Sequence, residues 1–328
     1  EGADSPVNLN SEQLRRLFDV PEGQRSRALQ RAVEELQATH PGAPPRAMSL
    51  VDLPQPVEPV VFKRGNPGNR GPQVPRQFLE VLSGPDRKPF ARGSGRLELA
   101  EAIASAENPL TARVAVNRVW MHHFGAPLVR TPGDFGLRSE APTHPELLDW
   151  LAGRFVREGW SLKRLHRLIL LSAAWQQRSE SDAVLMEADP ENRMLARQNR
   201  RRLDFEGLRD AMLQAGGGID LSMGGHSVEI TTRDYAPRRT VYGFVERQNL
   251  PGVFRTFDFA SPDTTSAQRF QTTVPQQALF LLNSPFALDQ ARRLATRPEV
   301  AGAPDEAARV TRMYRWVLQR DPEPGEVE

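Results

Sequence analysis

Apolar residues recur at helical spacing in three successive segments of residues 108–177, and each segment is long enough to need burial. We expect Asn108, which precedes a proline, to cap the first helix. Thr143 and Glu146 match the S/T-x-x-E capping box at the start of the second helix, and Ser161 opens the third. The pattern predicts three consecutive helices, the last two joined as an antiparallel hairpin by a short link.

The first of these helices, Asn108–Phe124, is apolar on most sides and is therefore predicted to be buried, with Gly125 ending it. Polar side chains nevertheless occur along it: Arg113, Asn117, Arg118, His122 and His123. Burying them is costly unless each has a partner, and we expect Asp134 and Arg138 in the following loop to be partners. Three tryptophans are expected to seal the unit: Trp150, Trp160 and Trp175.

Other parts of the chain predict further helices and a few strands. Helices are expected at Arg96–Ser105, over about three turns ending at Leu213, at Val274–Arg297 with a kink at Ser284-Pro285, and at Asp305–Gln319. Strands are expected at Ala47–Leu53 and Val57–Lys63, before a turn at Arg64–Gly68, and at Thr240–Glu246, paired with Ser227–Thr231. The fold class is therefore mainly α, with a multi-helix, bundle-like body and small β hairpins.

The N-terminal region has a different organisation. Residues 11–38 predict two helices divided at Val20-Pro21, and a proline-rich turn at residues 40–45 then marks a domain boundary. We expect residues 1–40 to be the C-terminal helices of a preceding domain or a linker. Residues 41–328 are expected to form one helical domain, truncated at its C-terminus. Because the chain starts without a Met or a leader, we interpret it as a fragment of a longer protein.

The charge is nearly balanced, with 43 Lys+Arg against 41 Asp+Glu, and almost all of the basic residues are arginines. Arginine forms bidentate pairs with carboxylates and tolerates partial burial, so this arginine-rich composition predicts internal ion-pair networks. A basic stretch at Arg197 and Arg200–Arg202 leaves a nucleic-acid surface open as an alternative. Interleaved stacking aromatics are missing there, so nucleic acid is the disfavoured partner.

The sequence contains no Cys, which excludes disulfides, cysteine-ligated zinc, iron–sulfur clusters and covalent haem attachment within these residues. We expect no cofactor within these residues and assign no metal ligands. No run of about 18 apolar residues occurs, so we expect no transmembrane segment.

Three groups of side chains have residue types suited to chemistry. The first is His122 and His123, whose rings point about 100° apart on a helix and so do not readily chelate one ion. We expect one of them to be buried and hydrogen-bonded and the other exposed. The second group, at a helix start, offers a general base beside an orienting carboxylate, or a purely structural cluster: Asp134, Arg138, Glu140 and His144.

The third group lies in the loop and helix after an aromatic cluster: Asp258, Ser261, Asp263, Arg269, Gln276 and Asn283. Two carboxylates in a Phe-rich loop suit an acid–base pair, a cation or sugar hydroxyls. The candidate catalytic residues are therefore His144, Asp134, Arg138, Asp258, Asp263 and Arg269. No Gly-x-Ser-x-Gly elbow, His-Glu-x-x-His helix, dinucleotide fingerprint or EF-hand loop occurs, so the sequence leaves open whether the protein is an enzyme.

Several stretches together, in this order, resemble one known family. They are Asn108–Val114, Asn117–Trp120, His123–Gly125, Thr131–Gly136, Thr143–Leu151, Gly159–Lys163, Arg239–Tyr242, Phe257–Asp263 and Gln271–Leu279. The family is the C-terminal domain of unknown function, family number 1553, of planctomycete proteins that also carry a cytochrome c-like domain. The likeness spans roughly residues 40–320.

The resemblance implies an exported, multi-domain parent with any haem in an upstream domain, and hence an extracytoplasmic location in the periplasm or at the cell surface. It supplies no catalytic residues. Our leading hypothesis is a structural or binding module of a larger exported, cytochrome c-associated protein. Its partners would be the upstream domains and a glycan or protein surface. The alternative is a hydrolase or carbohydrate-acting domain in which the Asp134/His144 and Asp258/Asp263 groups converge on one cleft.

Overall fold

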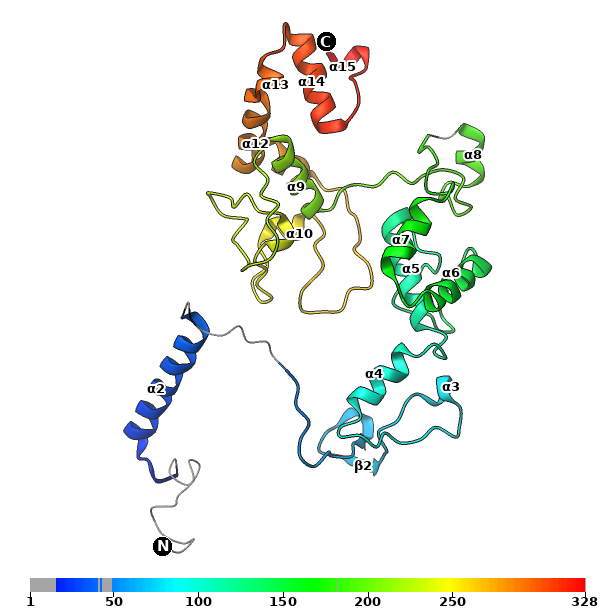
Figure 1. The fold of residues 1–328 in the computed structure, drawn as a ribbon, viewed down its shortest axis with the longest axis vertical. Coiled ribbons are helices and arrows are strands. Elements are labelled where there is room, and N and C mark those ends of the chain that lie inside the picture. Colours follow the sequence, from blue (N-terminus) through cyan, green and yellow to red (C-terminus); the bar gives the residue numbers. More distant parts are fainter. Residues whose placement is uncertain (1–15, 41, 43–48, 181, 328) are drawn as a thin grey trace, which may run out of the picture. The chain divides into compact units, whose positions relative to one another are not determined.

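The computed structural model describes residues 16–40, 42, 49–180 and 182–327. The chain divides into two compact units, residues 1–78 with 85–99 and residues 79–84 with 100–328. Within the described residues helices dominate, and the only sheet is a two-stranded antiparallel one (Figure 1). The predicted mainly α fold with a small β hairpin is confirmed. None of the helices described here is long and apolar enough to cross a membrane.

Helix α2, Val20–Thr39, begins where the sequence predicts the division at Val20-Pro21. Its start is fixed by a capping box: the Asp19 side chain accepts a bond from the backbone N–H of Glu22, and the Glu22 side chain accepts one from the backbone N–H of Asp19. This exchange satisfies N–H groups that have no partner inside the helix. Most of the predicted helix before α2, residues 11–15, lies outside the described residues.

The β hairpin of the first unit pairs β1, Val60–Phe62, with β2, Arg70–Gln73. The short 3-10 helix η1, Lys63–Gly65, lies at the predicted turn. The strand predicted at Ala47–Leu53 was wrong over its described part, because residues 49–53 form no strand, and residues 47 and 48 lie outside the described residues. Three prolines, Pro54, Pro56 and Pro59, precede β1, and a proline has no N–H to donate to a ladder. The strand that pairs with β1 comes from after the turn instead.

The second unit contains the three central helices, and their prediction is confirmed. They are α5, Thr111–Phe124, α6, Pro145–Arg157, and α7, Leu162–Leu170, preceded by α3, Glu80–Ser83, and α4, Arg96–Ala104. The three pack around one hydrophobic core, seen as the teal-to-green helices of Figure 1. Its most deeply buried members include Val116, Phe124, Leu128, Leu148, Leu151 and Ile169.

The starts of α6 and α7 differ in how well the sequence predicts them. Ser161 caps α7 as expected, because its side chain accepts a bond from a backbone N–H three residues later. The capping box predicted at Thr143 and Glu146 was wrong, since His144 is the N-cap residue and no described side chain caps that end. Pro145 occupies the first turn and keeps the residue before it out of the helical region, which moves the helix start.

Asn108 also acts differently from the predicted cap, because α5 begins at Thr111. Its Oδ1 accepts a bond from the Leu110 N–H at 3.0 Å, and its Nδ2 donates to the Ile103 carbonyl at 3.2 Å. The side chain therefore joins the end of α4 to the start of α5. Gly125 ends α5 as expected, with a left-handed φ of 80°.

The buried and half-buried polar side chains of α5 have partners, but not the predicted ones, whereas Arg118 and His122 are exposed. Asn117 is fully buried and bonds to both backbone groups of Val129: Nδ2 donates to the carbonyl at 3.0 Å, and Oδ1 accepts from the N–H at 2.9 Å. Arg113 donates to Asp149 of α6 at 2.7 Å, and this bond raises the pKa of Arg113. Neighbouring helices and backbone thus supply the partners.

The expected partners, Asp134 and Arg138, lie exposed in their own loop. The Asp134 carboxylate accepts a bond from the Gly136 N–H at 2.8 Å. A short acidic side chain two residues before a free N–H forms such a local turn readily. The prediction that these residues pair with α5 was therefore wrong.

The two adjacent histidines follow their prediction. His122 is exposed, whereas His123 is half-buried with Nε2 2.7 Å from Nδ1 of His166 on α7. Burial lowers the pKa of His123, and the nearby His166, Arg201 and His122 lower it further. This pair joins two helices of the core.

The tryptophans fulfil their prediction only in part. Trp160 and Trp175 pack against the first core. Trp150 is 49% exposed, with the Arg154 guanidinium 5.3 Å from its ring centroid. The expectation that Trp150 seals the core was wrong, because its position on α6 faces away from the apolar stripe.

The rest of the second unit contains the remaining helices and a second core. They are α8, Ala183–Ala188, α9, Phe205–Ala215, α10, Gly252–Thr256, α11, Pro275–Asn283, α12, Pro285–Thr296, α13, Pro298–Ala301, α14, Glu306–Leu318, and α15, Pro324–Val327. The core consists of Phe205, Ile230, Leu250, Phe254 and Phe257. The predicted kink at Ser284 is a full break, because Ser284 is extended at φ −70° and ψ 134° and caps α12.

The prediction of a strand at Thr240–Glu246 was wrong. The segment nevertheless contacts its expected partner, Ser227–Thr231. Thr240–Tyr242 forms the 3-10 helix η2, and a single bridge joins Val228 to Gly243. Asp210 accounts for the difference: one carboxylate oxygen accepts bonds from both the backbone N–H and the hydroxyl of Thr240, each at 2.7 Å. These bonds tie the segment to α9 in place of a strand ladder.

We predict that acid weakens the fold through His123. Because the pKa of His123 is lowered in the fold, the unfolded chain binds this proton more readily. The contribution of His123 to the unfolding free energy is complete above the pKa of the unfolded chain, about 6.5. It is lost as the pH falls through the lower pKa that His123 has in the fold. Urea unfolding should show a midpoint that drops from pH 7.5 to pH 5, and His123→Gln should reduce that drop. The exposed His226→Gln is the control, and an unchanged drop in the His123 variant would refute the assignment.

Candidate functional site

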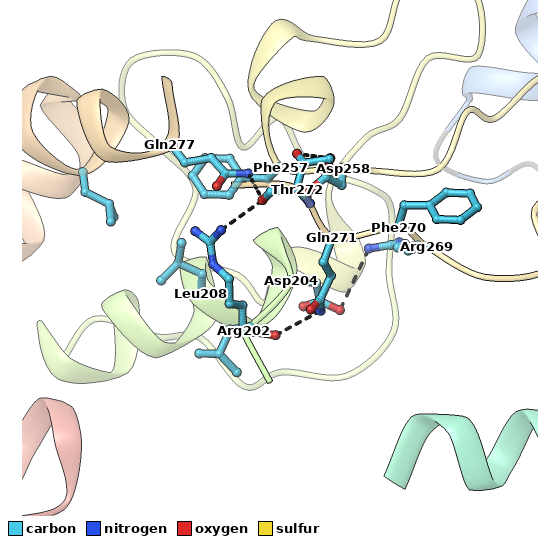
Figure 2. Close-up of a pocket in the computed structure, with 12 residues that line it drawn as sticks. Arg202, Asp204, Leu208, Phe257, Asp258, Arg269, Phe270, Gln271, Thr272 and Gln277 are labelled. Atoms are coloured by element: carbon cyan, nitrogen blue, oxygen red, sulfur yellow. Dashed lines mark hydrogen bonds and ion pairs between the residues drawn. The ribbon is translucent and has the colours of Figure 1, made fainter. Parts of the chain in front are cut away.

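A cavity of about 280 Å³ opens beside the second core, between α9 and α11. Its lining comes from four stretches of chain: Arg202, Leu203, Asp204, Leu208, Phe257, Asp258, Arg269, Phe270, Gln271, Thr272, Gln277 and Leu281. Figure 2 shows these side chains gathered around one space. Two of the six sequence candidates, Asp258 and Arg269, therefore lie at the same cavity.

The ring of Phe257 lines this cavity and is packed against two rings of the second core behind it. The ring centroid of Phe257 lies 5.5 Å from that of Phe205 on α9 and 5.3 Å from that of Phe280 on α11. Offset and edge contacts of this kind are favourable and hold rings in fixed orientations. The cavity thus has a rigid apolar side, provided by the second core itself.

Asp258 closes the loop that borders the cavity. Its backbone is left-handed, at φ 57°, a region that Asp tolerates better than most residues. One carboxylate oxygen accepts a bond from the Thr272 N–H at 2.7 Å, and the other accepts from the Thr272 hydroxyl at 2.8 Å. Both oxygens are therefore engaged in holding the two ends of the loop together.

Arg269 is fixed by acidic and aromatic neighbours. Its two Nη atoms donate to the two oxygens of Glu206 at 2.8 and 2.7 Å, and its guanidinium lies 4.6 Å from the Phe259 ring centroid. Hydrogen bonding to Glu206 raises the pKa of Arg269, and burial opposes this. Asp204, at 3.9 Å, also caps α9 by accepting from the Gly207 N–H. The carboxylates around Arg269 are all engaged.

Arg202 and Gln277 hold the segment before α11. Nη1 of Arg202 donates to the Thr272 carbonyl at 3.0 Å. Gln277 is 4% exposed, and its Nε2 donates to the carbonyls of Thr256 at 2.9 Å and Thr272 at 3.2 Å. The Gln277 Oε1 has no partner in the part of the chain described. The cavity lining therefore includes one buried amide whose acceptor is unused.

The other four sequence candidates are not among the residues described at this cavity. Asp134, Arg138 and Asp263 are exposed, and His144 is half-buried with its Nδ1 3.0 Å from the Thr143 hydroxyl. The Asp134/His144 group and the Asp258/Asp263 group therefore do not meet in this lining.

Sequence reasoning missed most of the residues that line the cavity. Arg202 was noted only as part of the basic stretch, with no link to the loop of Asp258, and Asp204 was not among the candidates. Gln277 had a signal: it lies three residues before the buried-face Phe280 and so on the same side of a helix, whereas the exposed Gln276 was chosen. Helical spacing would have separated the two glutamines.

The arrangement suits binding better than proton transfer. A general base needs a carboxylate or histidine able to reach the substrate proton, and the acidic side chains here already accept bonds from the protein. The charges in the lining also balance, with Arg202 and Arg269 against Asp204 and Asp258. Within the described residues, no group of three or more His, Asp or Glu side chains is placed to hold a metal ion.

Two aspartates of the same loop should respond differently to substitution. Asp258→Asn keeps the side-chain shape and the left-handed preference but removes a charged acceptor, so we expect a loss of about 1–3 kcal/mol in unfolding free energy. Asp263→Asn changes an exposed side chain and should stay within about 0.5 kcal/mol of wild type. Urea unfolding of both variants measures this, and equal effects would contradict the closing role of Asp258.

Comparison with known proteins places the chain in a family. No curated protein and no solved structure matches it. The profile of the family described as PSD1, protein of unknown function (DUF1553), matches residues 95–328, which is well over half of the chain and includes the whole cavity lining. The chain belongs to this PSD1 family of unknown function.

Proposed function

We propose that the chain is a non-catalytic binding module whose cavity between α9 and α11 holds one ring of a neutral glycan. The observation that carries this proposal is that every acidic side chain at the cavity already accepts bonds from the protein, while apolar side chains at the same place remain open. Such a lining can hold a ligand, and it offers no free carboxylate for acid–base chemistry.

The open apolar surface supports a ligand with an apolar face. Phe270 is 72% exposed, Leu203 60% and Leu281 44%, and all three line the cavity. The C–H face of a sugar ring packs on an exposed aromatic ring, and its hydroxyl groups bond to guanidinium, amide and carbonyl groups at the edge. Phe270 is the residue we assign to this stacking contact.

Size and charge narrow the ligand further. The cavity of about 280 Å³ lies at the lower end of the roughly 300–1,000 Å³ of small-molecule sites, which favours a single ring of a longer chain. The charges of the lining balance, with two arginines against two aspartates, and this favours a neutral ligand because the site offers no net opposite charge to replace the hydration of an ion.

The wider setting is also a proposal, supported by the family resemblance alone. We propose that this module belongs to a larger exported, cytochrome c-associated protein of planctomycete type, outside the cytoplasm. Its upstream domains would be its partners, and any haem would lie in one of them. In this setting a glycan-binding module would attach the parent protein to a polysaccharide.

An oligosaccharide array followed by calorimetric titration tests the proposed function. We expect retention on neutral oligosaccharides and not on uronic-acid ones, and a loss of affinity of about 3–10-fold in Phe270→Ala, the range of one aromatic contact. Phe244→Ala, exposed but outside the cavity, is the matched control.

Several outcomes of these measurements would contradict the proposal. Failure to bind any neutral oligosaccharide, or equal losses in the two phenylalanine variants, would exclude glycan binding at this cavity. Retention of uncharged peptides alone would replace the glycan by a protein partner. Release of shorter sugars that Asp258→Asn abolishes would show an enzyme.

A further inference from the structure

A second cavity, of about 420 Å³, lies beside the basic stretch that the sequence singles out. Its lining consists of Ser179, Glu180, Met186, Arg197, Gln198, Asn199 and Arg200. It shares no residue with the cavity between α9 and α11. An inference about this second cavity is therefore independent of the proposed glycan site.

The loop that carries Arg197 is held in a fixed conformation. Asn192, 3% exposed, donates to the Arg197 carbonyl at 2.6 Å and accepts from the Arg197 N–H at 3.2 Å. Its Nδ2 also donates to Asn199, which in turn donates to the carbonyl of Phe124 at the end of α5. Arg197 thus projects from a loop that is bonded to the first core.

The guanidinium of Arg197 is buried and forms no ion pair with a described residue, although its charge helps to lower the pKa of the nearby Asp189. The residue is 8% exposed, and its Nη2 donates to the carbonyls of Asp189 at 3.1 Å and Pro190 at 2.8 Å. Its Nη1 has no partner, and no ion pair to Arg197 occurs among the described residues. A buried cation in this state is costly, and an anion that reached it would relieve the cost.

The neighbouring arginines also lack acidic partners within the described chain. Arg200 is exposed in the same lining, and its Nε donates to the Ser179 hydroxyl oxygen at 3.4 Å. Arg201 donates to the His122 carbonyl at 2.7 Å. The ion-pair network expected from the composition therefore fails to reach this stretch, in contrast to Arg113 with its aspartate partner.

One acidic side chain borders the same cavity. Glu180 is exposed and forms no ion pair with a described residue. Its charge has the same sign as an incoming anion and would oppose binding weakly, because exposed charges are screened by water. This gives a second variant whose effect should run opposite to the loss of an arginine.

We propose that this second cavity is an anion site that takes a phosphate or a carboxylate group between the guanidinium groups of Arg197 and Arg200, with the Ser179 hydroxyl as a further donor. A guanidinium presents parallel N–H groups that match the oxygens of either anion. The volume exceeds that of one such group, so the anion is the acidic end of a larger molecule.

The test uses inorganic phosphate and acetate, titrated by calorimetry at constant ionic strength set with chloride. We expect binding of at least one anion. Arg200→Gln removes a hydrogen bond to a charged ligand and should weaken binding at least about tenfold, and Glu180→Gln removes a screened charge and should strengthen it about 2–5-fold. Both side chains are exposed, so both variants should keep the fold, which thermal melting verifies. Arg167→Gln, an exposed arginine of α7 outside the lining, is the matched control and should bind as wild type.

The titrations distinguish a phosphoryl ligand, a carboxylate ligand and the absence of a specific anion site. Stronger binding of phosphate identifies a phosphoryl group as the natural ligand, and stronger binding of acetate identifies a carboxylate. The proposal is overturned if neither anion binds, or if Arg200→Gln and Arg167→Gln weaken binding equally, which is the behaviour of a diffuse positive surface. Failure of glycan binding at the other cavity would leave these results unaffected.

Discussion

The fold depends on the two hydrogen bonds between the side chain of Asn117 and the backbone of Val129. Both groups are buried, so without the amide a backbone N–H and a carbonyl would lose water and gain no partner. The preceding residue, Leu128, accepts from the N–H of Thr143 just before α6. One short segment is thus bonded to α5 on one side and to the entry of α6 on the other, and the loop between them has little freedom.

Each buried polar group needs a hydrogen-bond partner, and this need explains the difference between the two cavities. Between α9 and α11 the acidic groups are already used by the protein: Asp258 holds Thr272, and Glu206 holds Arg269. What remains open there is apolar surface, which is why we propose binding of a neutral ring. Beside Arg197 the requirement is unmet, because a buried N–H lacks an acceptor. Because this N–H of Arg197 has no acceptor among the described residues, we propose that a bound anion supplies one.

Local pattern was enough to predict the longer helices, but not the short ones, α3, α8, α10, α13 and α15. Apolar spacing located α5, α6 and α7, the hydroxyl of Ser161 located one start, and Pro285 located the break between α11 and α12. The opposite fates of two adjacent histidines also followed from helical geometry alone. Each of these features depends on residues a few positions apart.

Partners and cavities depend on residues far apart, and there the predictions were incomplete. Arg113 pairs with an aspartate 36 residues away, and Arg209, 1% exposed, donates to the carbonyl of Ala236, 27 residues away. Composition predicted that arginines would be paired but not with which groups. Asp258 and Arg269 were grouped only because both follow the aromatic cluster in sequence, and both line the cavity, whereas Arg202 lies about 70 residues before the carbonyl it bonds.

The most direct test of this account is the unfolding free energy of Asn117→Ala, measured in urea beside Arg118→Ala as the exposed neighbour on the same helix. The account predicts a loss of about 2–4 kcal/mol for Asn117→Ala, because two buried backbone groups of Val129 lose their partners, and almost none for Arg118→Ala. A loss below about 0.5 kcal/mol for Asn117→Ala would contradict the claim that buried polar side chains hold this fold together.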